Sequence, residues 1–339
     1  HGGRGGFGGK GGRSGGGPGY GSVGQRVTDS ALRNEDIISG TEKKIVQAFE
    51  DNRSLQPKFV LLSNAPSSSM ISSDLESAAE KIAETGKIPA SNVKIYGDKD
   101  YLYGVSATLE AIGRLLMEKN EKQPDSVNIL GCNVIDWNEE QTNALVKDLE
   151  AQGISVISKW GAKGLTNDSI KNASKAALNL VVNISGLRIA KYMENEFDIP
   201  YIVGAPFGED AENRYMAVVK NALADPSFSS STFGIDTDME EDPGNTQTII
   251  IGEQLQANAI RSYLRNKGYQ NIRVLSFYEM DKSCMEKNDK KIASEDELKQ
   301  LTEGEALGLV IGNPDYKPAA GKELKWINLP NSGMSMVTK

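Results

Sequence analysis

The stretch Val127-Asn128-Ile129-Leu130-Gly131-Cys132 decides the fold, because it is a short apolar run that starts directly after the turn signal Gln123-Pro124-Asp125. Its length is that of a buried strand. The chain that follows predicts a helix over residues 138–152 that ends at Gly153, since glycine readily adopts the left-handed conformation of a helix C-cap. A buried strand followed by an amphipathic helix indicates a parallel sheet covered by helices.

The same alternation extends in both directions from this strand. Towards the amino terminus it predicts helices over residues 39–51, 74–85 and 103–119, and strands over residues 58–62 and 92–96. Towards the carboxyl terminus it predicts strands over residues 154–158, 177–182, 201–204, 248–252, 272–275 and 307–312, with helices over residues 167–176, 186–196 and 254–266. The sequence therefore predicts an α/β protein of Rossmann-like units, whose parallel sheets are flanked by helices.

Changes in composition place the boundaries of these units. We expect a glycine-rich arm over residues 1–27 and three α/β units over residues 28–122, 123–224 and 247–339. Residues 225–246 are polar and acidic, which indicates a linker. Their carboxylates lack the spacing of a calcium loop, so we interpret this segment as solvated chain.

Composition and charge restrict the classes of function. The chain has 339 residues, of which 38% are hydrophobic and 25% charged, which is typical of a soluble globular protein. A net charge of −8 makes a nucleic-acid-binding protein with a broad basic face an unfavourable interpretation. Neither an apolar run of membrane-spanning length nor a signal segment is present, so we expect no membrane association and a cytoplasmic location.

The inventory of metal ligands is small. Cys132 and Cys284 are the two cysteines and His1 is the one histidine, so a single copy of the chain cannot form a four-thiolate site or a histidine-based triad. We therefore predict that this chain alone holds no metal. Cys132 follows a strand, where a cysteine is more often a packing residue than a ligand. Cys284 lies in a polar segment, and we expect it at the surface without a specific role.

The glycine-rich arm allows several interpretations. Residues 1–24 contain 14 glycines. Such a segment buries too little apolar surface to offset the entropy lost when it becomes ordered, so a flexible arm is the simplest interpretation. Arg4-Gly5-Gly6-Phe7 also fits an arm that binds single-stranded nucleic acid. Gly19-Tyr20-Gly21-Ser22-Val23-Gly24 fits a dinucleotide-binding pattern, although no strand precedes it. The functional interpretation that we favour, a loop in which glycine lets the backbone approach an inorganic cluster closely, follows from the family resemblance described next.

Three stretches of the chain resemble the nitrogenase component 1 family. His1-Gly2-Gly3-Arg4-Gly5-Gly6 is similar to the family's H-G-x-x-G-C, Asp36-Ile37-Ile38-Ser39-Gly40-Thr41-Glu42-Lys43-Lys44 to D-x-V-F-G-G-E-K-K, and Leu178-Asn179-Leu180-Val181-Val182-Asn183 to L-N-L-V-H-C. Ile199-Pro200-Tyr201 is close to the family's G-I-P-W or G-I-P-Y. The resemblance covers nearly the whole chain and implies a series of three Rossmann-like units.

The cysteines of these family motifs are absent from this chain. Gly6 and Asn183 stand at two of the cysteine positions, and Val182 replaces the histidine beside the second. Ala65 of Asn64-Ala65-Pro66 stands at the cysteine of the family's T-C-P. Because glycine, alanine and an asparagine amide are poor ligands for cluster iron, the resemblance implies a divergent member of the family.

The strand pattern also predicts where a ligand would bind. In open parallel sheets, ligands bind beyond the carboxyl ends of the strands, and the resemblance implies a metal cofactor or tetrapyrrole at the same place. Arg188, near the start of the helix after Asn183, is either a residue that reaches an anionic ligand or a solvated helix residue. The predicted cofactor-binding residues are Gly6, Asn64, Ala65, Cys132, Asn133, Asn183, Ser185 and Arg188.

The resemblance implies a subunit of a nitrogenase-like two-component reductase. Such a subunit would pair with a homologous subunit or with itself and would receive electrons from a separate ATP-dependent iron–sulfur reductase. This chain lacks the phosphate-binding pattern of that reductase. An iron–sulfur cluster or other metallocofactor would be shared with, or supplied by, the partner subunit. The alternative is a non-catalytic scaffold or binding protein for a metallocofactor or a tetrapyrrole-like ligand.

Overall fold

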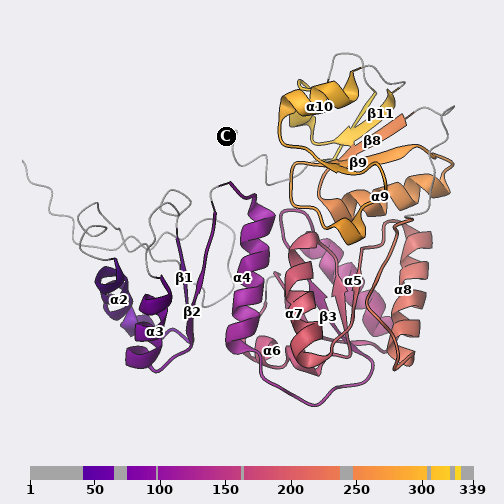
Figure 1. The fold of residues 1–339 in the computed structure, drawn as a ribbon. Coiled ribbons are helices and arrows are strands. Elements are labelled where there is room, and N and C mark those ends of the chain that lie inside the picture. Colours follow the sequence, from indigo (N-terminus) through magenta and orange to yellow (C-terminus); the bar gives the residue numbers. More distant parts are fainter. Residues whose placement is uncertain are drawn as a thin grey trace, which may run out of the picture. The chain divides into compact units, whose positions relative to one another are not determined.

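A computed structural model describes residues 41–64, 75–96, 98–161, 164–236, 247–303, 307–320 and 325–329 of the chain. Two compact units make up the protein, His1–Gly97 and Asp98–Lys339. Every strand pairing among the described residues is parallel. The fold is therefore α/β with parallel sheets flanked by helices, as the sequence predicts (Figure 1).

The described part of the first compact unit contains a two-stranded parallel sheet, two α-helices and a short 3-10 helix. Along the chain these are α2 (Glu42–Asp51), η1 (Arg53–Leu55), β1 (Val60–Ser63), α3 (Leu75–Gly86) and β2 (Ala90–Val93). Ile45 and Phe49 of α2 pack against the buried apolar residues of α3, among them Ile82. The helices form where the apolar spacing predicts them, whereas β2 begins two residues before the predicted strand over residues 92–96.

The second compact unit begins with a sheet of five parallel strands in the order β4-β3-β5-β6-β7. A cluster of buried apolar residues joins β3, β5 and β6 to α5 and α8, and α7 contacts β3, β5 and β6 and packs on α4. The elements are α4 (Tyr101–Leu116), β3 (Ser126–Leu130), α5 (Glu139–Ala151), β4 (Ser155–Trp160), α6 (Asn167–Lys171), η3 (Ala173–Lys175), β5 (Leu178–Val181), η4 (Ile184–Gly186), α7 (Leu187–Phe197), β6 (Tyr201–Val203), α8 (Glu209–Ala224) and β7 (Ser231–Thr232).

Local signals in the sequence set the ends of helix α5. Asn138 caps its amino end in a capping box with Gln141, in which each side chain accepts a hydrogen bond from the other residue's main-chain amide. At its carboxyl end, Gly153 has φ of 77° and open space around its Cα, which confirms the predicted left-handed cap.

A second sheet of five parallel strands follows, in the order β10-β9-β8-β11-β12. Helix α9 packs on one face through Ala257 and Ile260, and α10 packs on the other through Leu298, so β8, β9 and β11 lie between the two helices (Figure 1). The elements are β8 (Gln247–Ile251), α9 (Gln254–Asn266), β9 (Ile272–Ser276), η5 (Lys282–Cys284), β10 (Lys290–Lys291), α10 (Glu295–Thr302), β11 (Leu307–Gly312), η6 (Pro314–Tyr316) and β12 (Trp326–Asn328).

The structure differs from the predicted organisation at two places. Helix α4, which we expected within residues 28–122, belongs to the second compact unit and packs on α7. Part of the predicted linker is β7, in which Thr232 pairs with Val203 of β6. A two-residue polar strand leaves no apolar run in the sequence, so neighbouring strands alone place it. The other boundaries stay predictions, and residues 1–27 lie outside the described residues.

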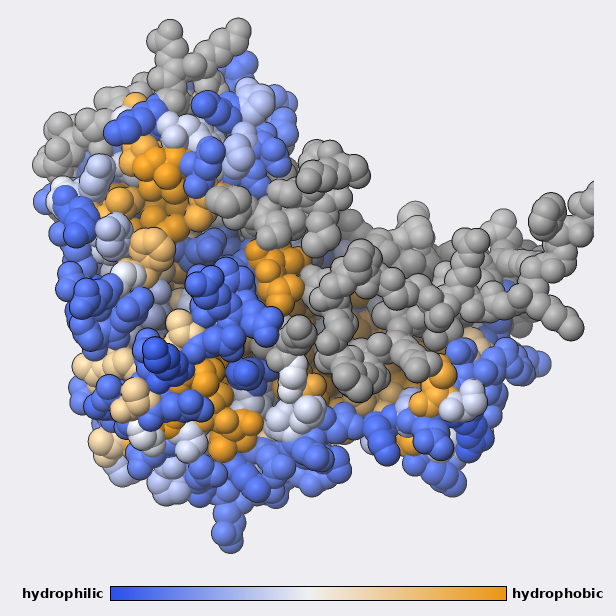
Figure 2. Space-filling view, turned by 180° about the vertical axis from the view of Figure 1, so that it is seen from behind, coloured by the Kyte–Doolittle hydropathy of each residue, from blue (hydrophilic) through white to orange (hydrophobic). Residues whose placement is uncertain are grey.

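Hydrophilic residues dominate the molecular face drawn in Figure 2, where apolar residues appear as smaller, separate patches. The exposed large apolar side chains include Val134, Phe207 and Tyr269. Scattered exposure of this kind is ordinary for a protein surface. Within the described ranges, no helix is both long enough and apolar enough to span a bilayer.

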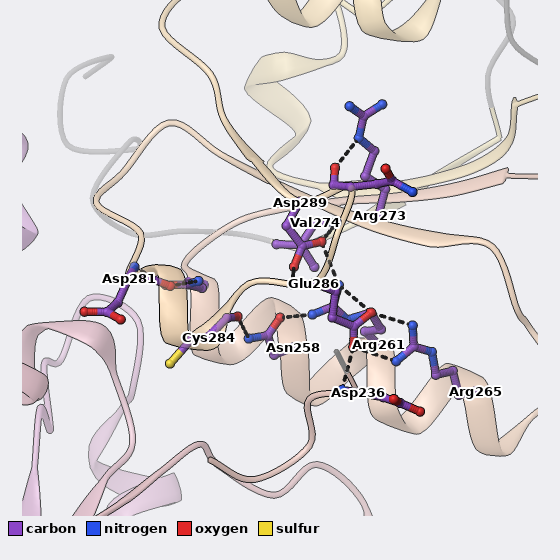
Figure 3. Close-up of polar contacts among 12 residues, drawn as sticks. Asp236, Asn258, Arg261, Arg265, Arg273, Val274, Asp281, Cys284, Glu286 and Asp289 are labelled. Atoms are coloured by element: carbon purple, nitrogen blue, oxygen red, sulfur yellow. Dashed lines mark hydrogen bonds and ion pairs between the residues drawn. The ribbon is translucent and has the colours of Figure 1, made fainter. Parts of the chain in front are cut away.

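A buried ion-pair network anchors the segment around η5 and β10 to helix α9. The side chain of Arg261 is 0% exposed, and its Nη1 lies 2.6 Å from Asp289 Oδ1 and 3.2 Å from Glu286 Oε2. Arg265, one helical turn further on, forms two hydrogen bonds with Glu286 (Figure 3). Arg261 also donates a hydrogen bond from Nη2 to Asn258 Oδ1, at 2.6 Å. Buried charges require such partners, so the network fixes one position of this segment on α9.

Replacing Arg261 should therefore destabilise the protein strongly. In Arg261→Ala the buried carboxylate of Asp289 loses its cation, and we expect the free energy of unfolding to fall by about 3 kcal/mol or more. Urea denaturation followed by circular dichroism measures this change. The control is Lys299→Ala, which removes an exposed pair with Glu303 and should change stability by less than about 0.5 kcal/mol. Equal effects of the two substitutions would show that the buried network does not anchor the segment.

Candidate functional site

The carboxyl ends of the two five-stranded sheets meet in the second compact unit. Asn183 follows β5 on one edge, and Glu253 follows β8 on the other. The amide of Ile184 donates a hydrogen bond to Glu253 Oε1 at 2.9 Å, and Gln256 Nε2 donates to the carbonyl oxygen of Asp136 at 3.3 Å. Because ligands of parallel sheets bind at such carboxyl edges, these residues form the candidate site.

Two glycines allow the loops after β3 and β5 to pack backbone against backbone. Gly131 has φ of 83°, and a Cβ added to it would lie 2.7 Å from the carbonyl oxygen of Asn183. A Cβ on Gly186 would lie 2.5 Å from the carbonyl carbon of Leu130. Any larger residue would have to displace main chain at both places. The position of Asn183 therefore depends on these two glycines.

Asp136 is the centre of a buried hydrogen-bond cluster. The hydroxyl group of Tyr101 donates to its carboxylate, at 2.7 Å from Oδ1 and 2.6 Å from Oδ2. Asn133 Nδ2 and Asn183 Nδ2 donate to Oδ2 at 3.1 and 3.2 Å. We call Tyr101, Asn133, Asp136 and Asn183 the Asp136 cluster. Helix α4 and the loops after β3 and β5 thus contribute to a single polar site.

Glu253 lies opposite this cluster as the N-cap residue of α9. Its carboxyl group accepts hydrogen bonds from the amides of Gln256 and Ile184, both at 2.9 Å, and the residue is 1% exposed. Burial, with a smaller contribution from the charge of Asp136, raises the pKa of Glu253 to about 7. Glu253 therefore exchanges a proton near neutral pH, unlike an ordinary glutamate.

Aromatic side chains extend the site along the second edge. The rings of Tyr101 and Tyr278 meet edge to face with centroids 5.2 Å apart, and the hydroxyl oxygens of Tyr278 and Tyr316 lie 3.4 Å apart. Burial raises the pKa of Tyr278 well above its usual range. Both hydroxyl groups can act as neutral donors near physiological pH.

The structure brings together three of the predicted site residues. Asn133 and Asn183 both bind Asp136, and Asn183 Oδ1 accepts hydrogen bonds from the amide and the hydroxyl group of Ser185, at 2.9 and 2.6 Å. Asn64 lies in the first compact unit, where its side chain bonds to both main-chain groups of Ile95. Gly6 and Ala65 lie outside the described residues.

The other predicted site residues have different surroundings. Cys132 is 1% exposed within the apolar cluster of its sheet, and burial raises the pKa of its thiol to about 12. The half-exposed guanidinium group of Arg188 pairs with Glu110 and lies 5.9 Å from the centroid of the Tyr103 ring.

The expectation that Cys284 lies at the surface was wrong, because the residue is 0% exposed. The short helix η5 packs it against α9, where the carbonyl oxygen of Cys284 accepts a hydrogen bond from Asn258.

Sequence reasoning missed Tyr101, Asp136 and Glu253. Glu253 stands between the predicted strand over residues 248–252 and the predicted helix over residues 254–266, so it occupies both a strand end and a capping position. That signal was available from the sequence. Asp136 and Tyr101 carry no comparable signal, since their contact links segments 35 residues apart.

The residues present do not fit an iron–sulfur cluster. Across the described parts of the chain, no group of three or more histidine, cysteine or acidic side chains is arranged to hold a metal ion. Asn183 uses both ends of its amide in bonds to Asp136 and Ser185. The buried thiol of Cys132 holds its proton, whereas cluster iron requires a thiolate.

Comparison with known proteins identifies the family. The family model for nitrogenase component 1 type oxidoreductases matches residues 20–330. The chain belongs to this family. A light-independent protochlorophyllide reductase subunit from Pleurastrum terricola is 29% identical over 54% of this chain and 38% of its own length. The nitrogenase iron-molybdenum cofactor biosynthesis protein NifE from Clostridium pasteurianum is 28% identical over 72% of this chain and 56% of its own length.

A solved structure supports the fold of this nitrogenase component 1 family member. Nitrogenase Cp1 at pH 6.5 superposes with a TM-score of 0.66 over 89% of this chain and 75% of that chain, at 15% sequence identity. The predicted resemblance and the predicted fold class are thus confirmed. The chain spans between about two fifths and three fifths of the length of the curated relatives that it matches.

The close approach of the two loops predicts a sharp difference between two glycines. In Gly186→Ala the new Cβ meets main chain of residue 130, and we expect a loss of about 2 kcal/mol in the free energy of unfolding. Gly104, inside α4, has open space around it, so Gly104→Ala should be neutral or stabilising by up to about 1 kcal/mol. Urea denaturation of both variants tests this, and an equally small effect at both positions would contradict the close packing.

Proposed function

We propose that this chain is the non-ligating subunit of a nitrogenase-like two-component reductase. It pairs with a homologous subunit that brings the thiolates for a metallocofactor, and an ATP-dependent iron–sulfur reductase supplies the electrons. The observation that carries the proposal is the hydrogen bonding of Asn183, which stands at a family cysteine position. Its amide nitrogen donates to Asp136, and its amide oxygen accepts from Ser185.

The hydrogen bonding around Asn183 supports a retained site. Asn133, Asp136, Asn183 and Ser185 are all buried, and the network satisfies both amide ends of Asn183. Buried polar groups are costly unless they are bonded, so each of these side chains fits the arrangement of the others. The site holds carboxyl, amide and phenol groups at the sheet edge.

A scaffold for a metallocofactor is the second candidate. It is favoured by the similarity to a cofactor biosynthesis protein, which covers 72% of this chain, and by a site without thiolates. A scaffold would hold the cofactor through hydrogen bonds and shape and would pass it on. Both candidates place the cofactor ligands on another protein, and they differ in whether electrons pass through the complex.

Iron analysis of anaerobically purified protein tests the proposal. We expect the isolated chain to be free of iron, and its complex with the co-purifying homologous subunit to contain iron and absorb broadly in the visible range. Cys132→Ala and Asn183→Ala should leave the iron content of the complex unchanged, because neither side chain is a ligand. The proposal fails if the isolated chain binds stoichiometric iron that Cys132→Ala removes.

Electron transfer separates the two candidate functions. Mixed with the iron-containing complex, the reduced ATP-dependent reductase should be oxidised when MgATP is added, as recorded from the absorbance of its own cluster. The matched control omits the complex. An iron-containing complex that never oxidises the reductase, but loses its iron to an acceptor protein, would establish the scaffold instead.

A further inference from the structure

We propose that Glu253 is a proton-operated latch between the carboxyl edges of the two sheets. With its proton bound, the edges stay in contact and enclose the Asp136 cluster. When the proton is lost, the edges separate and the cluster becomes accessible to a ligand or a partner. The latch concerns access to the site and is independent of which cofactor or electron donor serves it.

The position of Glu253 is the first support for a latch. It is anchored to its own sheet as the N-cap of α9, where the amide of Gln256 donates to Oε2, and it reaches the other sheet through Oε1 and the amide of Ile184. One carboxyl group therefore joins the two edges. The second link beside it, from Gln256 Nε2 to the carbonyl oxygen of Asp136, is longer, at 3.3 Å.

The surroundings of Glu253 make its charge unfavourable while the edges are in contact. Within the described residues it forms no ion pair with lysine or arginine. The groups that face it are the carboxylate of Asp136 from the loop after β3, the thiol of Cys284 from η5, and the amides of Ile184, Leu255 and Gln256. Tyr101 and Tyr278 lie beyond Asp136. The three amides favour the charged form, but burial and Asp136 outweigh them.

Separation of the edges removes that penalty. The carboxyl group would gain water and leave Asp136 while keeping the amide of Gln256, so its pKa would return towards the ordinary value of 4.5 from about 7. Because the pKa of Glu253 is higher in the closed form than in the open form, its bound proton stabilises the closed form. This stabilisation is complete below pH 4.5 and is lost as the pH rises through 7. The ratio of closed to open molecules should fall by up to about tenfold per pH unit in that window.

Another contact across the edges lacks this pH response and serves as a comparison. Lys191 of α7 pairs with Asp281, before η5, at 2.8 Å, and both side chains are partly exposed. Burial opposes the charge of both groups, but their pairing outweighs it, raising the pKa of Lys191 and lowering that of Asp281, so both stay charged near neutral pH. Lys191→Ala should weaken the contact at every pH, whereas a change at Glu253 should remove the pH dependence.

Distance measurements between spin labels test the latch. Lys147→Cys on α5 and Gln300→Cys on α10 provide exposed label sites on the two sides, while the native Cys132 and Cys284 are buried. Double electron–electron resonance on the isolated chain should show a single short distance at about pH 5.5 and a growing population at longer distance by about pH 8.5, on either side of the raised pKa. Glu253→Gln cannot ionise and keeps one of the two acceptor oxygens, so its distance distribution should be the same at both pH values.

The controls decide whether Glu253 is responsible. Glu212→Gln, which removes an exposed carboxylate on α8, should respond to pH like the unchanged chain. Lys191→Ala should open at lower pH and keep its pH dependence.

Two outcomes would overturn the proposal. One is identical distances at the acidic and the alkaline pH in the unchanged chain, and the other is a Glu253→Gln variant whose distances change with pH as those of the unchanged chain do. If Glu253→Gln does not fold, the pH series of the unchanged chain still decides the first of these outcomes. The measurement uses neither iron nor a partner, so its failure leaves the proposed function intact.

Discussion

The hydrogen bond from the Ile184 amide to the Glu253 carboxyl group is the constraint on which the arrangement of the site depends. It joins two sheets, each of which has its own apolar core, at the edges where ligands of parallel sheets bind. The amide of Ile184 belongs to the loop after β5, which packs closely on the loop after β3 because Gly131 and Gly186 have no side chain. The buried cluster around Asp136 lies directly behind this contact.

The chemistry of the site differs from that implied by the fold family. A parallel sheet edge provides a place for a ligand, but the side chains at that edge decide what binds. Here Asn183 is bonded to Asp136 and Ser185, and the thiol of Cys132 is turned into an apolar core. The nitrogenase component 1 framework is retained, while the described residues offer oxygen and amide groups in place of thiolates. This is why we propose that a partner subunit supplies the cofactor ligands.

Two kinds of buried charge serve different purposes in this molecule. Arg261 is fully paired with Asp289 and Glu286, so it fixes one position of the segment that carries η5 and β10. Glu253 forms no ion pair within the described residues and exchanges its proton near neutral pH. Buried pairs hold a structure, whereas a buried acid near its pKa can make a contact depend on pH.

The sequence by itself determined the α/β class, the order of most helices and strands, and the family. These properties depend on local features, which can be recognised from consecutive residues alone. Examples are the apolar run over residues 127–132, the capping residues Asn138 and Gly153, and the motif over residues 178–183. Strand β7 and helix α4 show the limit, because neighbouring elements decide where each belongs. Only the tertiary structure showed that Tyr101, Asp136, Asn183 and Glu253 meet, since their hydrogen bonds join segments between 35 and 69 residues apart. Burial, which decides the proton affinity of Glu253 and Cys132, is likewise a property of the packed chain.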